Sequence, residues 1–453
     1  MVGTMLLAGC SLYKPYEAKL EVPNDIMGPI SQPGDTVSMG TMGWREMFTD
    51  SLLQQLIVRG LANNTDVQAA QKTIEQAQND LRAVAMGNLP ILSFEPVGGL
   101  HHFDKVSSYP YQFPVVATWQ LNIFGQQTSK KRQQQARREM YRDYRQAVEA
   151  SLVANIASTY YSLVLLDRKL QIMCETEVVW EKSLESMRTL YEAGLYYSPA
   201  VYQMEASLLS VRSGIVELRE NILDTEAALC LLLSEAPHHI ERSPYGTFHM
   251  PERISVGVPL QLLALRPDVR QAERNMEIAY YDTQQARQSF YPDIVITAGA
   301  GWSNENGTVN PGKMLFEAIA SLTQPLFAQG KLRARYKNAQ LEQEKAQLQF
   351  SQTLLNAGNE VYRYLHLCHM TQQKAGYLRQ MVTSLNEAYE GTQELMDNGT
   401  NTYVEVLKAQ EDLLKAQLSE TENHILGIQA LINLYTALGG CSFGVWADHG
   451  EEE

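Results

Sequence analysis

The chain has 453 residues, of which 45% are hydrophobic, and a formal net charge of −14. A protein that binds nucleic acid needs a basic face to release phosphate counterions, so this acidity argues against nucleic acid as a partner. The sequence contains no run of 18 consecutive apolar residues, the length that a membrane-spanning helix requires. If the chain crosses a membrane, strands must do it.

The N-terminus is a short apolar run that ends at a cysteine. Leu7-Ala8-Gly9-Cys10 resembles the lipobox of bacterial lipoproteins, in which the preceding residues are removed and the cysteine is acylated. We therefore predict lipidation of Cys10. The basic start of a secretory signal is missing, so we expect this N-terminus to be truncated. The alternative is a flexible N-terminus with a chance cysteine.

Internal duplication organises the rest of the chain. A first set of motifs recurs about 200 residues later, so the two halves share one plan. The matching pairs are Leu61-Ala62 with Leu263-Ala264, Asp66-Val67 with Asp268-Val269 and Pro90 with Pro292, at an offset of 202 residues, and Leu190 with Leu395 and Gly194 with Gly399, at an offset of 205.

Each half is expected to open with a helix and continue with strands. Residues 44–87 are rich in Gln, Ala and Glu and repeat apolar positions with helical spacing, which predicts one helix. Residues 115–124 alternate between apolar and polar side chains, which predicts a strand with Trp119 on its apolar face. The same alternation over 294–303 and 316–323 predicts two strands in the second half.

Each half is then expected to end in a long helical hairpin. Residues 126–193 contain neither Gly nor Pro over 68 positions. At a rise of about 1.5 Å per residue, a helix of that size is roughly 100 Å long. Residues 331–398 have the same length and no Pro. Gly194 and Gly399 follow these helices and tolerate the left-handed conformation of a helix end, so we place the hairpin turns there.

Several motifs, taken in this order, resemble those of one protein family. They are Leu265-Arg266-Pro267-Asp268-Val269, Ala272-Glu273, Phe290-Tyr291-Pro292, Val406-Leu407, Ala409-Gln410, Asn433-Leu434-Tyr435 and Ala437-Leu438-Gly439-Gly440. Together they resemble the TolC/OprM-like outer-membrane factors, and within them the NodT-type efflux lipoproteins. The resemblance extends from Cys10 to Gly440, and the order, spacing and duplication of the motifs make it specific.

The resemblance implies an internally duplicated α+β fold. Long α-helical hairpins form a helical barrel that serves as a periplasmic tunnel. Each chain of a homotrimer also lends four strands to one shared 12-stranded transmembrane β-barrel. The expected place is the bacterial outer membrane, with a lipid anchor and a long periplasmic extension. The expected partners are a periplasmic adaptor protein, an inner-membrane pump of the resistance-nodulation-division type and outer-membrane lipid.

On this plan the chain divides into six segments. They are a residual signal peptide (1–9), a lipid-anchored tether (10–43), a first structural repeat (44–240), a linker (241–260), a second structural repeat (261–440) and a C-terminal tail (441–453). The function implied is a passive exit duct for drugs or other small molecules.

The channel gate is predicted at the hairpin turns, where resemblance places polar and acidic constrictions. The predicted gate residues are Tyr196, Tyr197, Asn401, Tyr403, Glu405 and Lys408. Three Glu405 carboxylates in a ring would favour cations, and the tyrosines would close the pore sterically. The alternative is that these residues contact the adaptor or are merely solvated turn residues.

No catalytic motif is present, so we expect neither enzymatic activity nor a cofactor. His366 and His369 lie at a spacing that suits a metal, but no third ligand is in register, and we read them as ordinary helix residues. Trp119 and Trp302 are predicted to anchor the strands at the membrane interface, or else to pack between protomers.

Two other functions remain open at this point. The first is an exit duct of another system, either type I protein secretion or metal-ion efflux. The second is a periplasmic coiled-coil scaffold that is anchored by lipid and forms no pore. The scaffold would explain the long helices and the acidity, but the alternating strands count against it.

Overall fold

The computed structural model describes residues 13–17, 39, 42–104, 106–194, 197–246, 264–304, 309, 311–398 and 403–440. Two compact units are present. The first comprises Met1–Val22, Gln71–Asp143 and Arg270–Thr353, and the second comprises Pro23–Ala70, Tyr144–Val269 and Leu354–Glu453.

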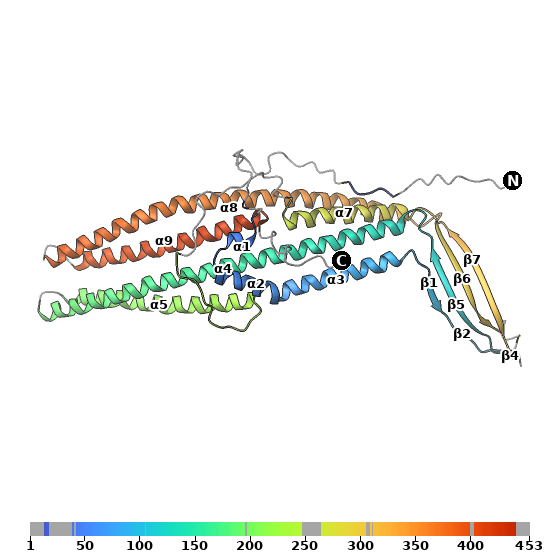
Figure 1. Cartoon of the computed structure of the whole chain (residues 1–453), viewed down its shortest axis with the longest axis horizontal. Helices are drawn as coiled ribbons and strands as arrows, with labels where there is room; N and C mark the ends of the chain where they lie inside the picture. Colours follow the sequence, from blue (N-terminus) through green and yellow to red (C-terminus); the bar gives the residue numbers. More distant parts are fainter. Residues whose placement is uncertain are drawn as a thin grey trace. The chain divides into compact units, whose positions relative to one another are not determined.

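The first unit contains all the strands found among the described residues (Figure 1). They are β1 (Ile91–Phe94), β2 (Val97–Gly98), β3 (His101–Phe103), β4 (Val106–Ser108), β5 (Tyr111–Gln120), β6 (Asp293–Ser303) and β7 (Lys313–Thr323). The main sheet is antiparallel in the order β1-β5-β6-β7, and β2 pairs with the other end of β5. β3 and β4 form a separate pair.

The strand predicted over 115–124 is shifted toward the N-terminus in the structure. β5 begins at Tyr111 and includes Pro114, whose carbonyl accepts from Glu95 N at 3.1 Å in the gap between β1 and β2. Proline has no N–H for a strand ladder, and for this reason the prediction began the strand too late. β5 also ends earlier than predicted, because the chain turns before Gly125, which has φ +76°.

The helices repeat with equal lengths in the two halves. They are α1 (Trp44–Met47), α2 (Ser51–Asn63), α3 (Thr65–Met86), α4 (Gln126–Glu192), α5 (Ser198–Leu232), α7 (Pro267–Gln288), α8 (Lys331–Asp397) and α9 (Tyr403–Ala437). α3 and α7 each have 22 residues, α4 and α8 each have 67, and α5 and α9 each have 35. The predicted duplication and both long hairpins are confirmed.

The segment 44–87, predicted as one helix, forms the three helices α1, α2 and α3. Asp50 has an extended backbone, and its carboxylate accepts from Leu52 N at 2.9 Å. Asn64 is also extended, with φ −60° and ψ 129°, and its side chain accepts from Asp66 N at 2.9 Å. Because Asp and Asn side chains satisfy free N–H groups, they end one helix and start the next. The prediction of a single helix was wrong at these two residues.

The two repeats hold the ends of their last helices in matching ways. In the first repeat, Asn64 Nδ2 donates to Leu232 O, at the end of α5, at 3.0 Å. In the second repeat, Arg266 Nη1 donates to Ala437 O, at the end of α9, at 3.0 Å. These pairs are related by the offsets of the duplication. The final carbonyls of a helix have no partner within it, so both side chains supply a missing donor.

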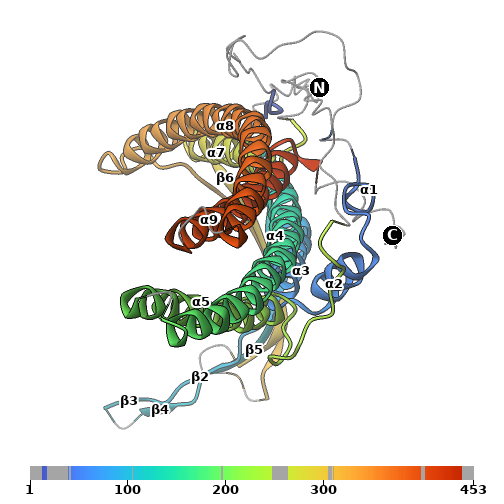
Figure 2. The same cartoon turned by 90° about the vertical axis from the view of Figure 1, so that its left-hand side faces the viewer.

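An apolar cluster, here called the hairpin cluster, joins α4, α5 and α9 in the second unit. Its members are Ile172, Met173, Trp180, Leu184, Met187, Val201, Met204, Leu208, Val211, Ile215, Tyr403, Leu407 and Leu414. Val201 and Tyr403 lie in the first turns of α5 and α9, so the turns of both hairpins lie at the same end of this unit (Figures 1 and 2).

The core between α4 and α7 in the first unit is polar. Gln133 Nε2 donates to Asp282 Oδ1 at 2.9 Å, and Gln285 Nε2 donates to Gln133 Oε1 at 3.0 Å. Gln288 Nε2 donates to Ser129 Oγ at 3.1 Å. Burying an amide is costly unless it is hydrogen-bonded, so these contacts favour one alignment of the two helices over others.

A tyrosine clamp on α7 holds the short segment Tyr13–Glu17 in the first unit. The Tyr13 ring stacks on Tyr281 with centroids 6.4 Å apart, and Tyr16 packs against Tyr280 at 5.6 Å. The Tyr280 hydroxyl donates to Lys14 O at 3.1 Å. Burial raises the pKa of Tyr16 to about 12, so its hydroxyl stays neutral.

Candidate functional site: the sheet faces and the hairpin ends

The strand register divides the main sheet into two faces, because residues paired across neighbouring strands point the same way. The apolar face carries Leu92, Phe94, Phe113, Val115, Ala117, Trp119, Ile294, Ile296, Ala298, Ala300, Trp302, Met314, Phe316, Ala318, Ala320 and Leu322. The three apolar sets predicted from the sequence therefore share one face. All three charged residues of β1, β5, β6 and β7 lie on the other, mixed face: Asp293, Lys313 and Glu317.

Trp119 and Trp302 lie on the apolar face and are 42% and 43% exposed. Trp119 pairs with Ile296, six residues before Trp302 on β6. At about 3.4 Å per residue, the two indoles are separated by roughly 20 Å along the strand. The indole N–H of Trp119 donates to Asn88 O at 2.8 Å, which fixes this ring just before β1. Their role as interfacial anchors stays a prediction.

The mixed face carries isolated charges. Glu317 pairs with Gly299, which leaves space beside the carboxylate, and it has no hydrogen bond or ion pair with any residue that the structure describes. Asp293 accepts from Gln120 Nε2 at 3.3 Å. A face with charged and hydroxyl groups suits water, and a face of apolar side chains suits lipid.

The two hairpin turns have the same length. Five residues separate α4 from α5, and five separate α8 from α9. Gly194 has φ +75°, and its N–H donates to Tyr191 O at 2.9 Å, so this residue takes the left-handed conformation at the end of α4. Gly399, Tyr196 and Asn401 lie outside the described residues, as does Cys10.

The remaining gate residues differ in their surroundings. Tyr197 is 85% exposed, whereas Tyr403 is 5% exposed and its hydroxyl lies 3.0 Å from Met204 Sδ. Glu405 and Lys408 are exposed. Lys408 Nζ donates to Asp412 at 2.7 Å, and this hydrogen bond raises the pKa of the ammonium group. In a single chain, Tyr197 presents a free ring and Tyr403 acts as part of the hairpin cluster.

Polar contacts between the hairpins were not foreseen from the sequence. Lys169 Nζ of α4 donates to Glu422 of α9 at 2.8 Å, and Ser207 Oγ of α5 donates to Glu411 of α9 at 3.2 Å. Such pairs join residues more than 200 positions apart. The spacing of apolar and polar residues along a single helix cannot indicate such long-range pairs. Any motion that separates α9 from α4 and α5 must break these contacts.

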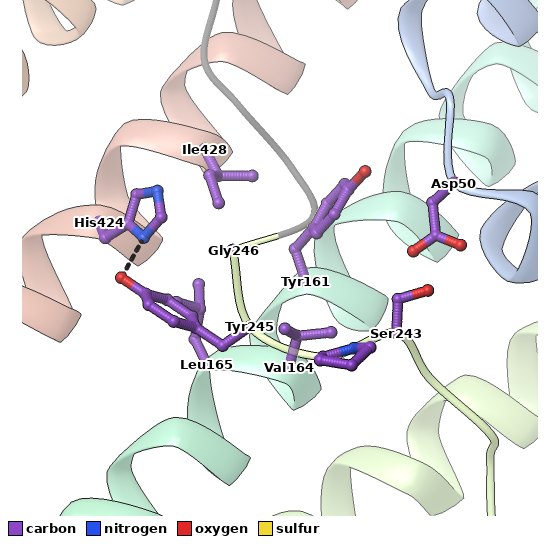
Figure 3. Close-up of a pocket in the computed structure, with 10 residues that line it drawn as sticks. Asp50, Tyr161, Val164, Leu165, Ser243, Tyr245, Gly246, His424 and Ile428 are labelled. Atoms are coloured by element: carbon purple, nitrogen blue, oxygen red, sulfur yellow. Dashed lines mark hydrogen bonds between the residues drawn. The ribbon is translucent and has the colours of Figure 1, made fainter.

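A small cavity lies between α4, α9 and the segment that follows α5 (Figure 3). Its volume is about 20 Å³, enough for one water molecule. Tyr245 and His424 meet there, with the hydroxyl 3.0 Å from Nδ1. Burial, with Arg379 nearby, lowers the pKa of His424, so the imidazole is neutral at pH 7. Asp50 lines the opposite side and accepts from the Tyr160 hydroxyl at 2.8 Å.

The structure was also searched for metal sites and membrane-spanning helices. Among the described residues, no three His, Cys, Asp or Glu side chains are grouped so that they could hold a metal ion. His366 and His369 are both exposed on α8, and the His366 ring packs against Tyr362 at 4.3 Å. Within the described part of the chain, no helix has the length and apolarity needed to cross a membrane.

A family model described as outer membrane efflux protein matches residues 56–235 and 258–440. The chain belongs to this family. The two matched segments coincide closely with the two structural repeats, and the match spans both hairpins and all strands of the main sheet. The resemblance to outer-membrane factors that the motifs indicated is confirmed.

Several members of the outer membrane efflux protein family resemble the chain over nearly its whole length. The cation efflux system protein CusC of Escherichia coli O6:H1 is 26% identical and is matched over 96% of each chain. The probable outer membrane lipoprotein SilC of Salmonella typhimurium is also 26% identical, over 96% of each chain. The solvent efflux pump outer membrane protein SrpC of Pseudomonas putida is 25% identical, over 97% of each chain.

The solved structure of the outer-membrane channel OprN has the same fold. It superimposes with a TM-score of 0.86 and 20% sequence identity, over 95% of this chain and 99% of OprN. The predicted fold class is therefore confirmed, as is the assignment of this efflux protein to the outer membrane.

Proposed function

We propose that the chain is the exit duct of a tripartite efflux system, through which drugs or other small molecules leave passively. In this proposal an inner-membrane pump of the resistance-nodulation-division type supplies the energy, and a periplasmic adaptor joins pump and duct. The observation that carries the proposal is a sheet with one continuous apolar face and one mixed face. A periplasmic scaffold that forms no pore would not need a sheet with one apolar face and one mixed face.

The same sheet supports assembly as a homotrimer. Among the described strands, β7 pairs only with β6, and β1 and β2 pair only with β5, so both edges of the main sheet carry unpaired backbone groups. Unpaired N–H and C=O groups are too costly in lipid, and strands from other copies would satisfy them. The sheet would then close into one shared transmembrane wall with its apolar face outward.

The test of the exit-duct proposal is twofold. Purified protein in planar bilayers should conduct ions, and deletion of the gene should sensitise the cell to exported compounds, with recovery on complementation. A protein that forms no conductance, from a gene whose loss leaves susceptibility unchanged, would rule out the duct.

A cation efflux system is the second candidate, supported by the similarity to CusC. Type I protein secretion is a further alternative. The deleted strain should be exposed to metal salts as well as drugs, and its secreted proteins compared with those of the parent. Sensitivity confined to metal salts would favour cation efflux, and a missing secreted protein would favour secretion.

The lipid anchor at Cys10 is part of the proposal. The Leu-Ala-Gly-Cys motif and the similarity to SilC, a probable outer membrane lipoprotein, support it. Cells grown with a clickable fatty acid should label the wild-type chain and leave Cys10→Ala unlabelled. Equal labelling of the two would exclude Cys10 as the acylated residue.

The gate is proposed to lie at the hairpin turns and to involve Tyr196, Tyr197, Asn401, Tyr403, Glu405 and Lys408. The exposed Tyr197 ring and the exposed Glu405 carboxylate support a direct role, and Tyr403 would act through its packing on Met204. Single-channel recordings test this. Unchanged conductance and ion selectivity in both Glu405→Ala and Tyr403→Ala would remove the gate from this position.

A further inference from the structure

The helices α4 and α8 begin at the same end of the main sheet. β5 and β7 both pair antiparallel with β6 and end opposite its first residues, at Gln120 and Thr323. Residues 121–125 then lead from β5 to α4, and residues 324–330 lead from β7 to α8. Both helix starts belong to the first unit and lie beside the sheet in Figure 1.

The first three turns of these two helices are basic. Residues 126–136 contain three cations and residues 331–341 contain four, and neither stretch contains an Asp or a Glu. In a chain with a net charge of −14, this is a pronounced local excess of positive charge. We call the seven cations the basic collar: Lys130, Lys131, Arg132, Lys331, Arg333, Arg335 and Lys337.

Nothing in the described part of the protein neutralises the basic collar. Six of its side chains are exposed and Lys130 is half-buried, and none of the seven forms an ion pair with a carboxylate among the described residues. Arg132 donates to a neutral acceptor, Gln135 Oε1, at 3.2 Å. The positive end of the helix macrodipole disfavours cations at a helix start, so these charges do not stabilise their own helices. They point to an anionic partner outside the chain.

The chain just before each basic stretch is apolar and exposed. Ile123, shortly before α4, is 57% exposed, and Leu326 and Phe327, shortly before α8, are 96% and 86% exposed. In both repeats the chain therefore passes from the apolar face of the sheet to an exposed apolar turn and then to cations. The same order of surfaces is found at the edge of a bilayer, where hydrocarbon gives way to head groups.

We propose that the basic collar binds the phosphate groups of anionic phospholipids in the periplasmic leaflet of the outer membrane. The inference rests on the proposed function, in which the sheet spans the membrane with its apolar face in lipid. Anionic head groups attract Lys and Arg side chains near a membrane surface, and neutral head groups do so much less. In the proposed homotrimer, the collars of all copies would form one ring around the duct.

The extent of the basic collar along its helices suits a head-group layer. Lys331 to Lys337 cover about 9 Å along α8, and Lys130 to Arg132 lie roughly 6–9 Å from the start of α4, at about 1.5 Å per residue. The head-group layer on each side of a bilayer is about 5–8 Å thick. Long Lys and Arg side chains reach several ångströms along a membrane surface, so all seven cations can meet phosphate groups at this depth.

The N-terminal segment gives a second reason to place this end of the sheet at the membrane. A Cβ atom on Gly125, the last residue before α4, would lie 3.3 Å from Tyr13 Cβ. Tyr13 comes three residues after Cys10, the proposed site of the lipid anchor. Three residues of chain reach at most about 11 Å, so acyl chains on Cys10 would enter the leaflet that the collar faces.

Lipid competition on the purified protein tests the inference. The detergent-solubilised trimer is given equal amounts of dioleoyl phosphatidylglycerol, which is anionic, and dioleoyl phosphatidylcholine, which has no net charge. Native mass spectrometry then counts the lipids that stay bound. The acyl chains are identical, so the apolar face of the sheet contributes equally to the binding of both. We expect the wild-type protein to retain several times more phosphatidylglycerol than phosphatidylcholine.

Two variants with the same net charge locate the binding. The collar variant carries Lys331→Gln, Arg333→Gln, Arg335→Gln and Lys337→Gln, and should lower the ratio of bound phosphatidylglycerol to phosphatidylcholine by at least about threefold. The control removes as many exposed cations of the same types from helices of the second unit, by Lys182→Gln, Arg219→Gln, Lys374→Gln and Arg379→Gln. It should keep the wild-type ratio. The masses in the same spectra report whether each variant is still a trimer.

The outcomes separate the inference from the proposed function. Equal retention of the two lipids by the wild-type protein would overturn the inference, and so would an unchanged ratio in the collar variant, as expected if the collar binds an acidic protein instead. If such a wild-type protein still conducts ions in planar bilayers, the exit duct stands without the lipid contact. If the wild-type protein neither forms a trimer nor conducts, the exit duct fails, and the inference fails with it.

Discussion

Asn64 and Arg266 occupy equivalent positions in the two repeats, and each donates a hydrogen bond to a carbonyl at the end of a helix. The donor is an amide in the first repeat and a guanidinium in the second. Asn64 is neutral and serves two helix ends at once. Arg266 is charged and 9% exposed, and it also holds the carboxylates of Asp268 and Glu360, each at 2.8 Å. Burial alone lowers the pKa of Arg266, but the two carboxylates outweigh burial, and the net shift is upward. The guanidinium is therefore permanently charged.

Replacing Arg266 by Met should destabilise the protein by about 2 kcal/mol, because the Ala437 carbonyl loses its donor and two carboxylates lose their cation. Thermal unfolding of the detergent-solubilised chain, followed by circular dichroism, measures the loss. The control is Arg59→Met, which removes an exposed arginine 3.7 Å from Glu235 and should cost under about 0.5 kcal/mol. Equal losses in the two variants would contradict this role for Arg266.

Tyr160 links three segments of the second unit. Its hydroxyl donates to Asp50 at 2.8 Å and accepts from Ser243 N at 2.9 Å. Burial raises the pKa of Tyr160 from 10.0 to about 12. Because the folded state has the higher pKa, the stabilisation is complete below pH 10 and is lost as the pH rises from 10 to 12.

Tyr160→Phe should therefore lower stability at pH 8 by about 1–3 kcal/mol and flatten the decline of stability between pH 10 and pH 12. Chemical unfolding across this pH range is the measurement. Other buried tyrosines, such as Tyr281, titrate in the same window, so some decline should persist. A variant with an unaltered slope would show that Tyr160 ionises as it does in the unfolded chain.

The break between α2 and α3 depends on one amide side chain. Asn64→Ala removes the N-cap of α3 and the donor to Leu232 O, and should cost about 1–2 kcal/mol. Asn63→Ala is the matched control, because Asn63 is exposed and lies in the last turn of α2. Denaturant unfolding of both variants decides the matter. A larger effect at Asn63 than at Asn64 would refute the capping role.

Close approach of β5 and β6 depends on a missing side chain. A Cβ atom on Gly301 would lie 2.5 Å from both Phe113 O and Pro114 Cα, whereas one on Gly299 would meet nothing closer than 4.0 Å. Gly301→Ala should push the strands apart and cost about 1–3 kcal/mol, with fewer heat-resistant trimers on gels. Gly299→Ala should be tolerated. Two variants that behave alike would exclude steric contact as the cause.

Sequence periodicity predicted the elements that depend on local information. The predicted bounds of α4 and α8 are off by a single residue at one end, because the absence of Pro from both helices and the glycine after each helix are local signals. The breaks at Asp50 and Asn64 were missed although the capping contacts are local, because Asp and Asn also occur inside helices, as Asp80 does in α3, and the residue type alone does not mark a cap. The burial of Tyr403 was missed because its partner Met204 lies on another helix, far away in the sequence.

The duplication also explains why a single chain leaves so much apolar surface exposed. Each repeat supplies one hairpin and part of the sheet, and the hairpin cluster joins the two hairpins in one chain. Apolar side chains on α5 and α8, such as Leu209 and Tyr377, are exposed, and the edges at β1 and β7 have no further strand in the described part of that chain. Both kinds of surface support the proposed homotrimer.

The two faces of the sheet provide the last prediction. Phe316 lies on the apolar face near the middle of β7, and Ile319 lies on the mixed face of the same strand; they are 74% and 53% exposed. A lysine facing lipid near the midplane costs about 2–4 kcal/mol per copy, whereas one facing water costs little. Phe316→Lys should therefore strongly reduce the amount of trimer in the outer-membrane fraction, and Ile319→Lys should leave it near the wild-type level. Immunoblots of fractionated membranes measure both. Loss of the trimer in Ile319→Lys, with a normal amount in Phe316→Lys, would mean that the lipid and water faces are the reverse of those assigned.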